Sequence, residues 1–174
     1  MAEKTYTAAA IGVAFASAKS LLGLMNAHAT RKVKLWRAWQ LNNQTTGVTG
    51  VLTSCNLRRI TSLSGGTAVT PIPHDTSNAT VDLTSISCIT GGTFANNATY
   101  NPFRVWMWSG DEPAVSSATS DELECIVPLM CIWDSTGSAD LEPIVCNNGE
   151  GIHITQPGAN AVGISDIFME FSVA

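Results

Sequence analysis

Three histidines are the side chains best suited to acid–base or metal chemistry, and their surroundings in the sequence give that chemistry little support. His28, His74 and His153 are widely separated, and no two have the spacing of metal ligands. His74 precedes Asp75, a pair that could orient a general base. That pair lies in a proline-flanked loop, where an aspartate followed by Thr and Ser commonly forms an Asx turn. We therefore expect no catalytic residue and no enzyme.

Acidic and sulfur-containing side chains give no stronger signal. The acidic run at 121–124 lacks the glycine turn and distant glutamate of a calcium loop, so it is typical of a solvated turn. No phosphate-binding loop, dinucleotide-binding glycine motif, GxSxG motif or CxxC pair is present. We expect no metal and no cofactor. The odd number of cysteines, in apolar runs, favours buried free thiols: Cys55, Cys88, Cys125, Cys131 and Cys146.

Aromatic residues beside basic ones suggest interaction surfaces instead. Trp36 and Trp39 follow a basic run at 31–34, a combination found in single-strand nucleic-acid platforms. Neighbours on a strand alternate faces, however, and the sequence pI of about 5.0 gives no basic footprint, so we expect no nucleic acid. Three tryptophans fall opposite the clearest inward-facing set and are candidates for an oligomer interface: Trp36, Trp106 and Trp108. Alternatively, both faces of these strands are buried within the domain.

Charge is sparse and unevenly distributed along the 174 residues. Charged residues make up 13% of the chain, about half the usual share. All nine Lys and Arg residues lie at or before Arg104, whereas eleven of the fourteen Asp and Glu residues follow it. If the two classes occupy opposite sides of the fold, complementary potentials would favour head-to-tail assembly, and salt would weaken it.

A period of two predicts an all-β domain. Val33, Leu35, Arg37, Trp39 and Leu41 alternate with more polar neighbours, which predicts one inward face. Further strands are expected within 20–25, 51–63, 81–90, 103–108, 123–133, 151–155 and 167–173, with a short extended piece at 67–72, and Gly, Pro and Asn turns separate them. About eight strands at this spacing favour a β-sandwich, and we expect a jelly roll of two four-stranded sheets over residues 19–174.

The alanine-rich start of the chain is expected to be an N-terminal arm. Residues 1–18 could be extended or a short helix, and Glu3 offsets Lys4, so we expect no cleaved signal peptide. The apolar run is too short for a membrane-spanning helix. An arm that lies along a partner gains affinity through backbone hydrogen bonds. Its candidate partner-binding residues are Lys4, Tyr6, Ile11, Val13, Phe15 and Lys19.

Five segments carry a resemblance to a known class of proteins. They read LLGLMNA (21–27), LNNQTTGVTGV (41–51), TAVTPIPHDT (67–76), GEGIHI (149–154) and VGISDIFMEF (162–171). In these the chain resembles small all-β virion structural proteins of tailed bacteriophages. The resemblance implies a capsid decoration (cement) protein that is made in the host cytoplasm and located in the virion. Its partners would be the major capsid protein or other virion proteins, and a homotrimer is favoured.

Two alternatives stay open. The chain could be a receptor- or carbohydrate-binding head module of a tail fibre, with Trp106, Trp108 and Trp133 stacking on sugar rings. It could also be a filament subunit whose N-terminal arm completes the sheet of a neighbour.

Overall fold

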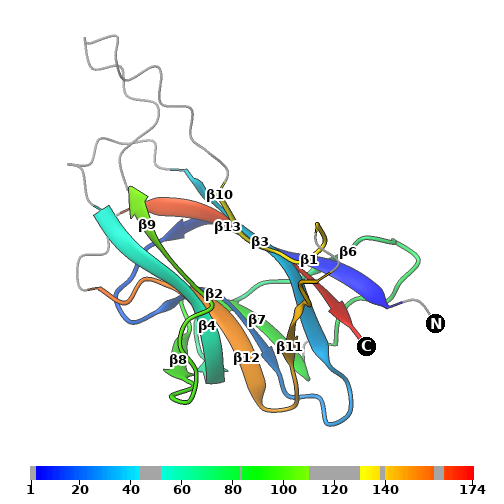
Figure 1. The fold of residues 1–174 in the computed structure, drawn as a ribbon. Coiled ribbons are helices and arrows are strands. Elements are labelled where there is room, and N and C mark those ends of the chain that lie inside the picture. Colours follow the sequence, from blue (N-terminus) through cyan, green and yellow to red (C-terminus); the bar gives the residue numbers. More distant parts are fainter. Residues whose placement is uncertain (1–2, 44–51, 83, 110–129, 138–139, 159–162) are drawn as a thin grey trace.

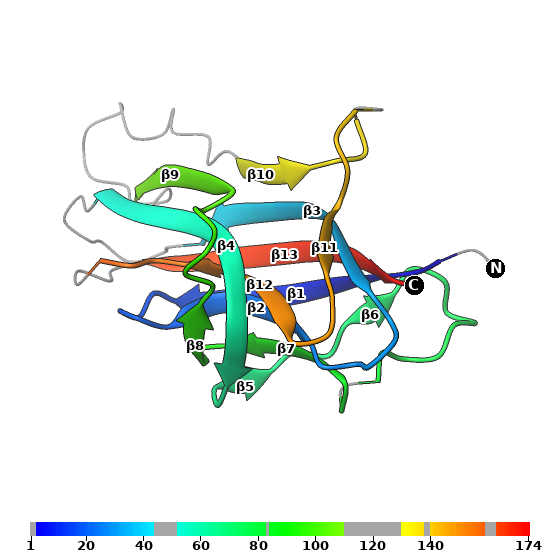
Figure 2. The ribbon, with the colours of Figure 1, turned by 60° about the horizontal axis from the view of Figure 1, so that its bottom comes forward.

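The protein is an all-β sandwich of two antiparallel sheets, as the sequence predicts. The computed structural model describes residues 3–43, 52–82, 84–109, 130–137, 140–158 and 163–174. Figures 1 and 2 show the two layers, with the described chain ends close together at one end of the sandwich. Sheet A contains β1 (Lys4–Ala14), β3 (Val33–Asn42), β6 (Ile72–Pro73), β10 (Met130–Asp134), β11 (Ile144–Cys146) and β13 (Ile164–Val173). Sheet B contains β2 (Ser20–Asn26), β4 (Leu52–Ser64), β5 (Thr67–Ala68), β7 (Ile86–Thr90), β8 (Thr93–Asn96), β9 (Arg104–Ser109) and β12 (Glu150–Thr155).

The order of the strands places distant parts of the sequence side by side. Sheet A runs β10–β3–β13–β1–β6, and β11 also pairs with β3. Sheet B runs β5–β7–β2–β12–β4–β8, and β9 pairs with the first half of β4. Within the described residues the sheets hold six and seven strands, not four each. The sandwich is therefore confirmed, whereas the expected jelly-roll topology is not.

The core lies between the sheets and follows the period-two pattern of the best-predicted strands. Ile152 and Ile154 of β12 are fully buried, as are Ile167, Met169 and Phe171 of β13. Branched and aromatic side chains at alternate positions fit a pleated strand with one face on the core. These strands form where the sequence predicted them.

The N-terminal segment is a strand of the sandwich, so the expectation of an arm over residues 1–18 is wrong. β1 pairs with β13 from Lys4↔Val173 to Ala14↔Ile164. Tyr6 is only 3% exposed, and its ring stacks on Phe171 with centroids 5.6 Å apart. Alanine favours helices in isolation, but here alternate alanines face the core and the pairing with β13 overrides that preference.

A β-bulge in β3 corrects the predicted inward face of that strand. Phe171 of β13 pairs with Leu35, and Glu170 pairs with Arg37, so Trp36 is the extra residue. One extra residue reverses the alternation. The core-facing residue is therefore Leu35 before the bulge and Ala38 after it. Arg37, Trp39 and Leu41, expected to face inward, lie on the outer face instead.

Replacement of Tyr6 distinguishes an integral strand from an arm. We expect Tyr6→Ala to lower the free energy of unfolding by about 3 kcal/mol or more, because it removes a buried ring from the core. Ile11→Ala in the same strand is the control. Its side chain is 63% exposed, so the change should stay within about 0.5 kcal/mol. Urea unfolding followed by circular dichroism measures both, and equal stability of the two variants would contradict the position of β1.

Candidate interaction surface

The outer face of sheet A carries an apolar row that crosses four strands. Ala9, Phe168, Trp39 and Cys131 are directly opposed in register on β1, β13, β3 and β10. Phe168 and Trp39 are half-buried, and Cys131 is exposed. Directly opposed side chains on one face of a sheet lie in contact range of one another. Among the described residues, no element packs over this row.

A charged row runs beside the apolar one, at the next outward positions. Thr7, Glu170, Arg37 and Asp134 occupy it, again in register across the four strands. The Arg37 guanidinium lies 3.7 Å from Glu170 and 3.3 Å from Asp134. Hydrogen bonds from the Thr136 hydroxyl and backbone N–H, together with Arg37, lower the pKa of the Asp134 carboxyl, so this charge persists at neutral pH.

These contacts correct the expected separation of basic and acidic sides. Arg37 comes from the basic half of the sequence and pairs with two acids of the later half. Arg59 pairs in the same way with Glu150, at 3.6 Å. The cause is topological, because β3 lies between β10 and β13 in sheet A and β12 lies between β2 and β4 in sheet B. Within the described residues, two basic side chains from the early part of the sequence, Arg37 and Arg59, thus form ion pairs with acids from the later part. Each such surface pair contributes little to stability.

Among the described strands, the edge of β1 beside this face has no partner over about half its length. The backbone N–H of His74 donates to Thr5 O, which shows that odd-numbered residues of β1 direct their backbone groups towards β6. β6 pairs only with Tyr6 and Thr7. In the described part of the chain, the backbone groups of Ala9 and Ile11 therefore have no ladder partner on this side. Ile11 stands at this edge with its side chain 63% exposed.

The bulge at Gly12 ends this edge. Gly12 has a φ of +66°, and its backbone N–H donates to Asp166 Oδ1 at 2.7 Å. The register of β1 against β13 shifts at this point, between Ala10 and Val13. Bulges twist an edge away from further pairing, so the segment that can accept a strand is short.

The other residues predicted to bind partners are scattered. Phe15 and Tyr6 are buried in the core, and Val13 is half-buried. The Lys19 ammonium donates to Thr93 Oγ1 at 2.8 Å, beyond the end of β1. Lys4 lines a cavity at the opposite end of β1. Only Ile11 of this set lies on the open edge.

Of the predicted interface tryptophans, Trp36 lies on the outer face of sheet A and Trp106 does not. The Trp36 indole N–H donates to Ser172 Oγ at 2.9 Å, beside the charged row. The Trp106 indole N–H donates to buried Gln40 at 3.0 Å, so this ring joins the two sheets. Its strand neighbours are the exposed ones, with Val105 at 63% and Met107 at 55%. The side chain of Trp108 lies outside the described residues.

The sugar-stacking alternative loses part of its basis in the same way. Trp133 is half-buried, with its ring edge-to-face against Phe103 at 5.9 Å and the Arg104 guanidinium 5.8 Å from its centre. Trp106 is held by Gln40. The aromatic rings named for this alternative do not form one exposed platform in the described chain.

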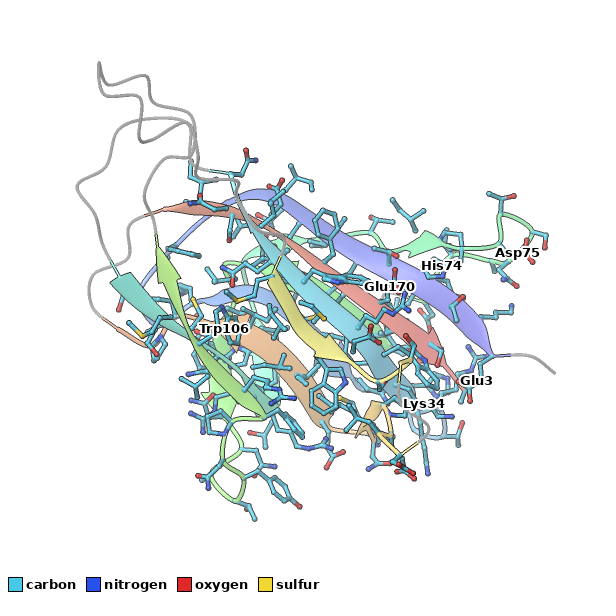
Figure 3. The ribbon with its side chains drawn as sticks, turned by 45° about the horizontal axis from the view of Figure 1, so that its top comes forward. Glu3, Lys34, His74, Asp75, Trp106 and Glu170 are labelled. Carbon is cyan, nitrogen blue, oxygen red and sulfur yellow. The ribbon has the colours of Figure 1, made fainter. Side chains whose placement is uncertain are left out.

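His74 and Asp75 do not pair. The Asp75 carboxylate accepts hydrogen bonds from the Ser77 N–H at 2.9 Å and the Ser77 hydroxyl at 2.7 Å, which confirms the predicted Asx turn. His74 Nε2 instead lies 2.8 Å from Thr7 Oγ1 (Figure 3). The described cysteines are free thiols, and Cys55, Cys88 and Cys146 are buried as predicted, whereas Cys131 is exposed and the prediction that it is buried is wrong; Cys125 lies outside the described residues.

Sequence reasoning missed a fully buried histidine. His153 on β12 points away from Ile152 and Ile154, yet it is 0% exposed because Phe94 of β8 packs on it, with ring centroids 4.2 Å apart. Gly23 stands opposite it, where a Cβ would approach Leu63 to 2.7 Å. Within the part of the chain that the structure describes, neither ring nitrogen has a hydrogen-bond partner. The sequence carries no signal for this, because the cover comes from the fold of β4 and β8.

Comparison with known protein families, curated proteins and solved structures finds no match to this chain. In the described residues, no helix has the length and apolar character needed to cross a membrane.

His153 makes stability depend on pH. Burial, reinforced by Arg58, lowers its pKa from 6.5 to about 3. Below pH 6.5 His153 therefore binds a proton in the unfolded chain but not in the folded chain. The unfolding equilibrium should then shift by up to tenfold per pH unit towards the unfolded state. His153→Leu should abolish this contribution between about pH 6 and 4.5, above the range where carboxylates with lowered pKa titrate. Urea titrations across that range measure it, and parallel pH curves for the two proteins would contradict the burial of His153.

Proposed function

We propose that this protein is a non-enzymatic structural protein of a phage virion, most specifically a capsid decoration protein that binds and stabilises the shell. Two lines support the proposal: the sequence resemblance to small all-β virion proteins, and the outer face of sheet A. The observation that carries it is the apolar row Ala9–Phe168–Trp39–Cys131, in register across four strands and uncovered in the described chain.

The chemistry of this surface suits adhesion. Its centre is apolar and aromatic, and the charged row beside it supplies orientation, a distribution typical of protein interfaces. The open edge of β1 adds backbone donors and acceptors at Ala9 and Ile11, which could accept a strand from a neighbouring protein. A decoration protein needs only such a surface, because it stabilises a shell by adding buried area between its subunits.

The proposed protein attaches to its partner through the edge of a built-in strand and not through a flexible arm. Because β1 is built into sheet A, the N-terminal segment contributes through its open edge and through Ile11. The same fact weakens the filament alternative, in which that segment leaves its own sandwich to complete a neighbour. The partners proposed are the major capsid protein or other virion proteins, and trimeric assembly at closed symmetry stays part of the proposal.

A charge placed on the open edge tests the proposal. We expect Ile11→Lys to weaken association with purified particles of the encoding phage at least tenfold, because a lysine at a strand edge opposes further pairing. Val105→Lys is the matched control: Val105 is equally exposed, at 63%, but lies on β9 of sheet B. Co-sedimentation of the labelled protein with particles measures binding. Unchanged binding of Ile11→Lys would exclude the β1 edge, and absence of wild-type binding would exclude the virion role.

Cys131 offers an independent footprint of the apolar row. It is the exposed thiol among the described cysteines, whereas burial raises the pKa of Cys55, Cys88 and Cys146 to about 12. In a Cys125→Ser background, we expect a maleimide to label Cys131 in the free protein and at least fivefold more slowly in the particle-bound protein. Mass spectrometry of the labelled peptide gives the rate. Equal rates would show that the bound surface lies elsewhere.

A further inference from the structure

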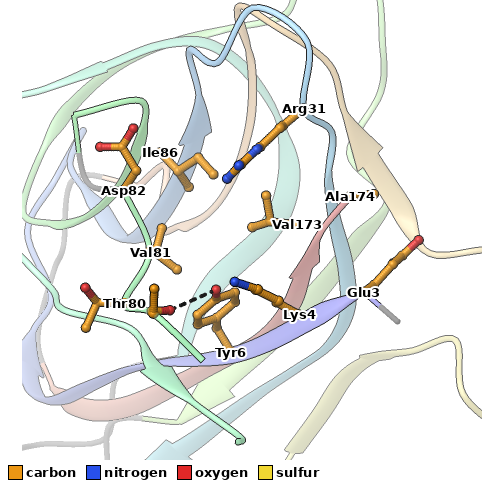
Figure 4. Close-up of a pocket in the computed structure, with 11 residues that line it drawn as sticks. Glu3, Lys4, Tyr6, Arg31, Thr80, Val81, Asp82, Ile86, Val173 and Ala174 are labelled. Carbon is orange, nitrogen blue, oxygen red and sulfur yellow. Dashed lines mark hydrogen bonds between the residues drawn. The ribbon is translucent and has the colours of Figure 1, made fainter. Parts of the chain in front are cut away.

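A cavity of about 560 Å³ opens at the end of the sandwich where β1 begins and β13 ends. Its walls come from both sheets and from the loops before β3 and β7 (Figure 4). This volume is in the range of sites that bind small organic molecules. The cavity lies apart from the apolar row.

The wall of the cavity has a well-anchored apolar part. Tyr6, Val81 and Ile86 are buried side chains that also border the cavity, and Val173 completes this side. Tyr6 is fixed twice, because its hydroxyl donates to Ala79 O at 3.2 Å and its ring stacks on Phe171. Tyr6, Val81 and Ile86 are 3%, 7% and 1% exposed, so they form a rigid backing, and half-buried Val173 offers most of the accessible apolar surface on this side.

Two cationic side chains point into the same cavity from different elements. Figure 4 shows the Lys4 ammonium and the Arg31 guanidinium directed towards its centre, from β1 and from the loop before β3. Within the described residues, neither forms an ion pair. Their positive charges are therefore available to a bound anion.

The acids at the rim already have partners. The Asp82 carboxylate accepts hydrogen bonds from the Thr84 N–H and hydroxyl and from the Ser85 hydroxyl, at 2.6–3.0 Å. Glu3 pairs with Lys34 and accepts a hydrogen bond from the Ser172 hydroxyl. The Ala174 oxygen accepts from the Lys32 N–H at 3.1 Å. The neutral donors lower the pKa of Asp82 to about 2 and so keep its carboxylate charged, whereas Glu3 is paired with Lys34; an anion would therefore lie on the side of the cavity where Lys4 and Arg31 project.

We propose that this cavity binds an amphiphilic carboxylate, a ligand with an apolar body ending in a carboxylate group. The carboxylate would lie between Lys4 and Arg31, whose guanidinium can donate two parallel hydrogen bonds to it. The apolar body would lie against Val173 and the exposed part of Val81. A medium-chain fatty acid has this chemistry, and so does the carboxylate end of an apolar peptide. This binding does not depend on the virion role proposed above.

Calorimetric titration with decanoate tests the proposal on the full chain. We expect saturable binding of one decanoate, and binding of decanol at least tenfold weaker because it lacks the charge. Arg31→Gln and Lys4→Gln should each weaken decanoate binding about tenfold. Lys32→Gln, which removes a neighbouring exposed charge outside the cavity wall, should change it less than twofold. Thermal unfolding of each variant shows that the fold is retained.

The remaining outcomes show whether the bound carboxylate belongs to a fatty acid or to a peptide end, and which results would overturn the proposal. Tighter binding of acetyl-Val-Leu-Leu with a free carboxylate, relative to its amide and to decanoate, would assign the site to peptide ends. Absence of saturable binding of both carboxylates would overturn the proposal. So would decanoate binding that is equal in Arg31→Gln, Lys4→Gln and the unmodified protein.

Discussion

The pairing of β1 with β13 is the constraint on which the rest of the structure depends. It joins the first and last described strands along nearly their whole length and places β13 between β1 and β3. The apolar row, the charged row and the open edge all exist because these three strands are held in one register. The cavity lies where the same pair ends, next to Lys4 and Val173. A slip of one residue would turn every outward side chain of β13 into the core.

The sequence predicts correctly the strands whose hydrophobic alternation is regular. Its predictions are wrong where a bulge shifts the alternation by one residue, or where pairing with a distant strand determines the conformation. Ile167, Met169 and Phe171 were assigned to one face correctly, because β13 alternates without interruption at these positions. A bulge adds Trp36 as an extra residue in β3, and only the pairing with β13 shows it. The alternation in the sequence therefore assigns Arg37 and Trp39 to the wrong face. The alanines of β1 have no strand preference of their own, and their conformation is set by pairing about 160 residues away in the chain.

The candidate surface and the cavity were harder to predict, because each is assembled from residues that only topology brings together. Ile11 was named from the sequence as a contact residue, and the structure gives it a strand edge instead of an arm. Phe168 and Cys131 had no distinguishing signal, because their importance comes from lying opposite Trp39. Lys4 and Arg31 converge from segments with no common motif. Buried His153 likewise owes its environment to Phe94 of a neighbouring strand.

The central place of β13 also has a consequence for biosynthesis. β13 leaves the ribosome after every other described strand, yet β1 and β3 have no contact in sheet A without it. Sheet A therefore cannot reach its complete strand order until β13 has been synthesised, and until then β6 is the only described partner of β1. Folds dominated by such distant pairings form slowly, and exposed strand edges associate with other chains in the meantime. The edge of β1 that β13 covers in the folded protein is thus the edge most open to other chains before β13 is in place.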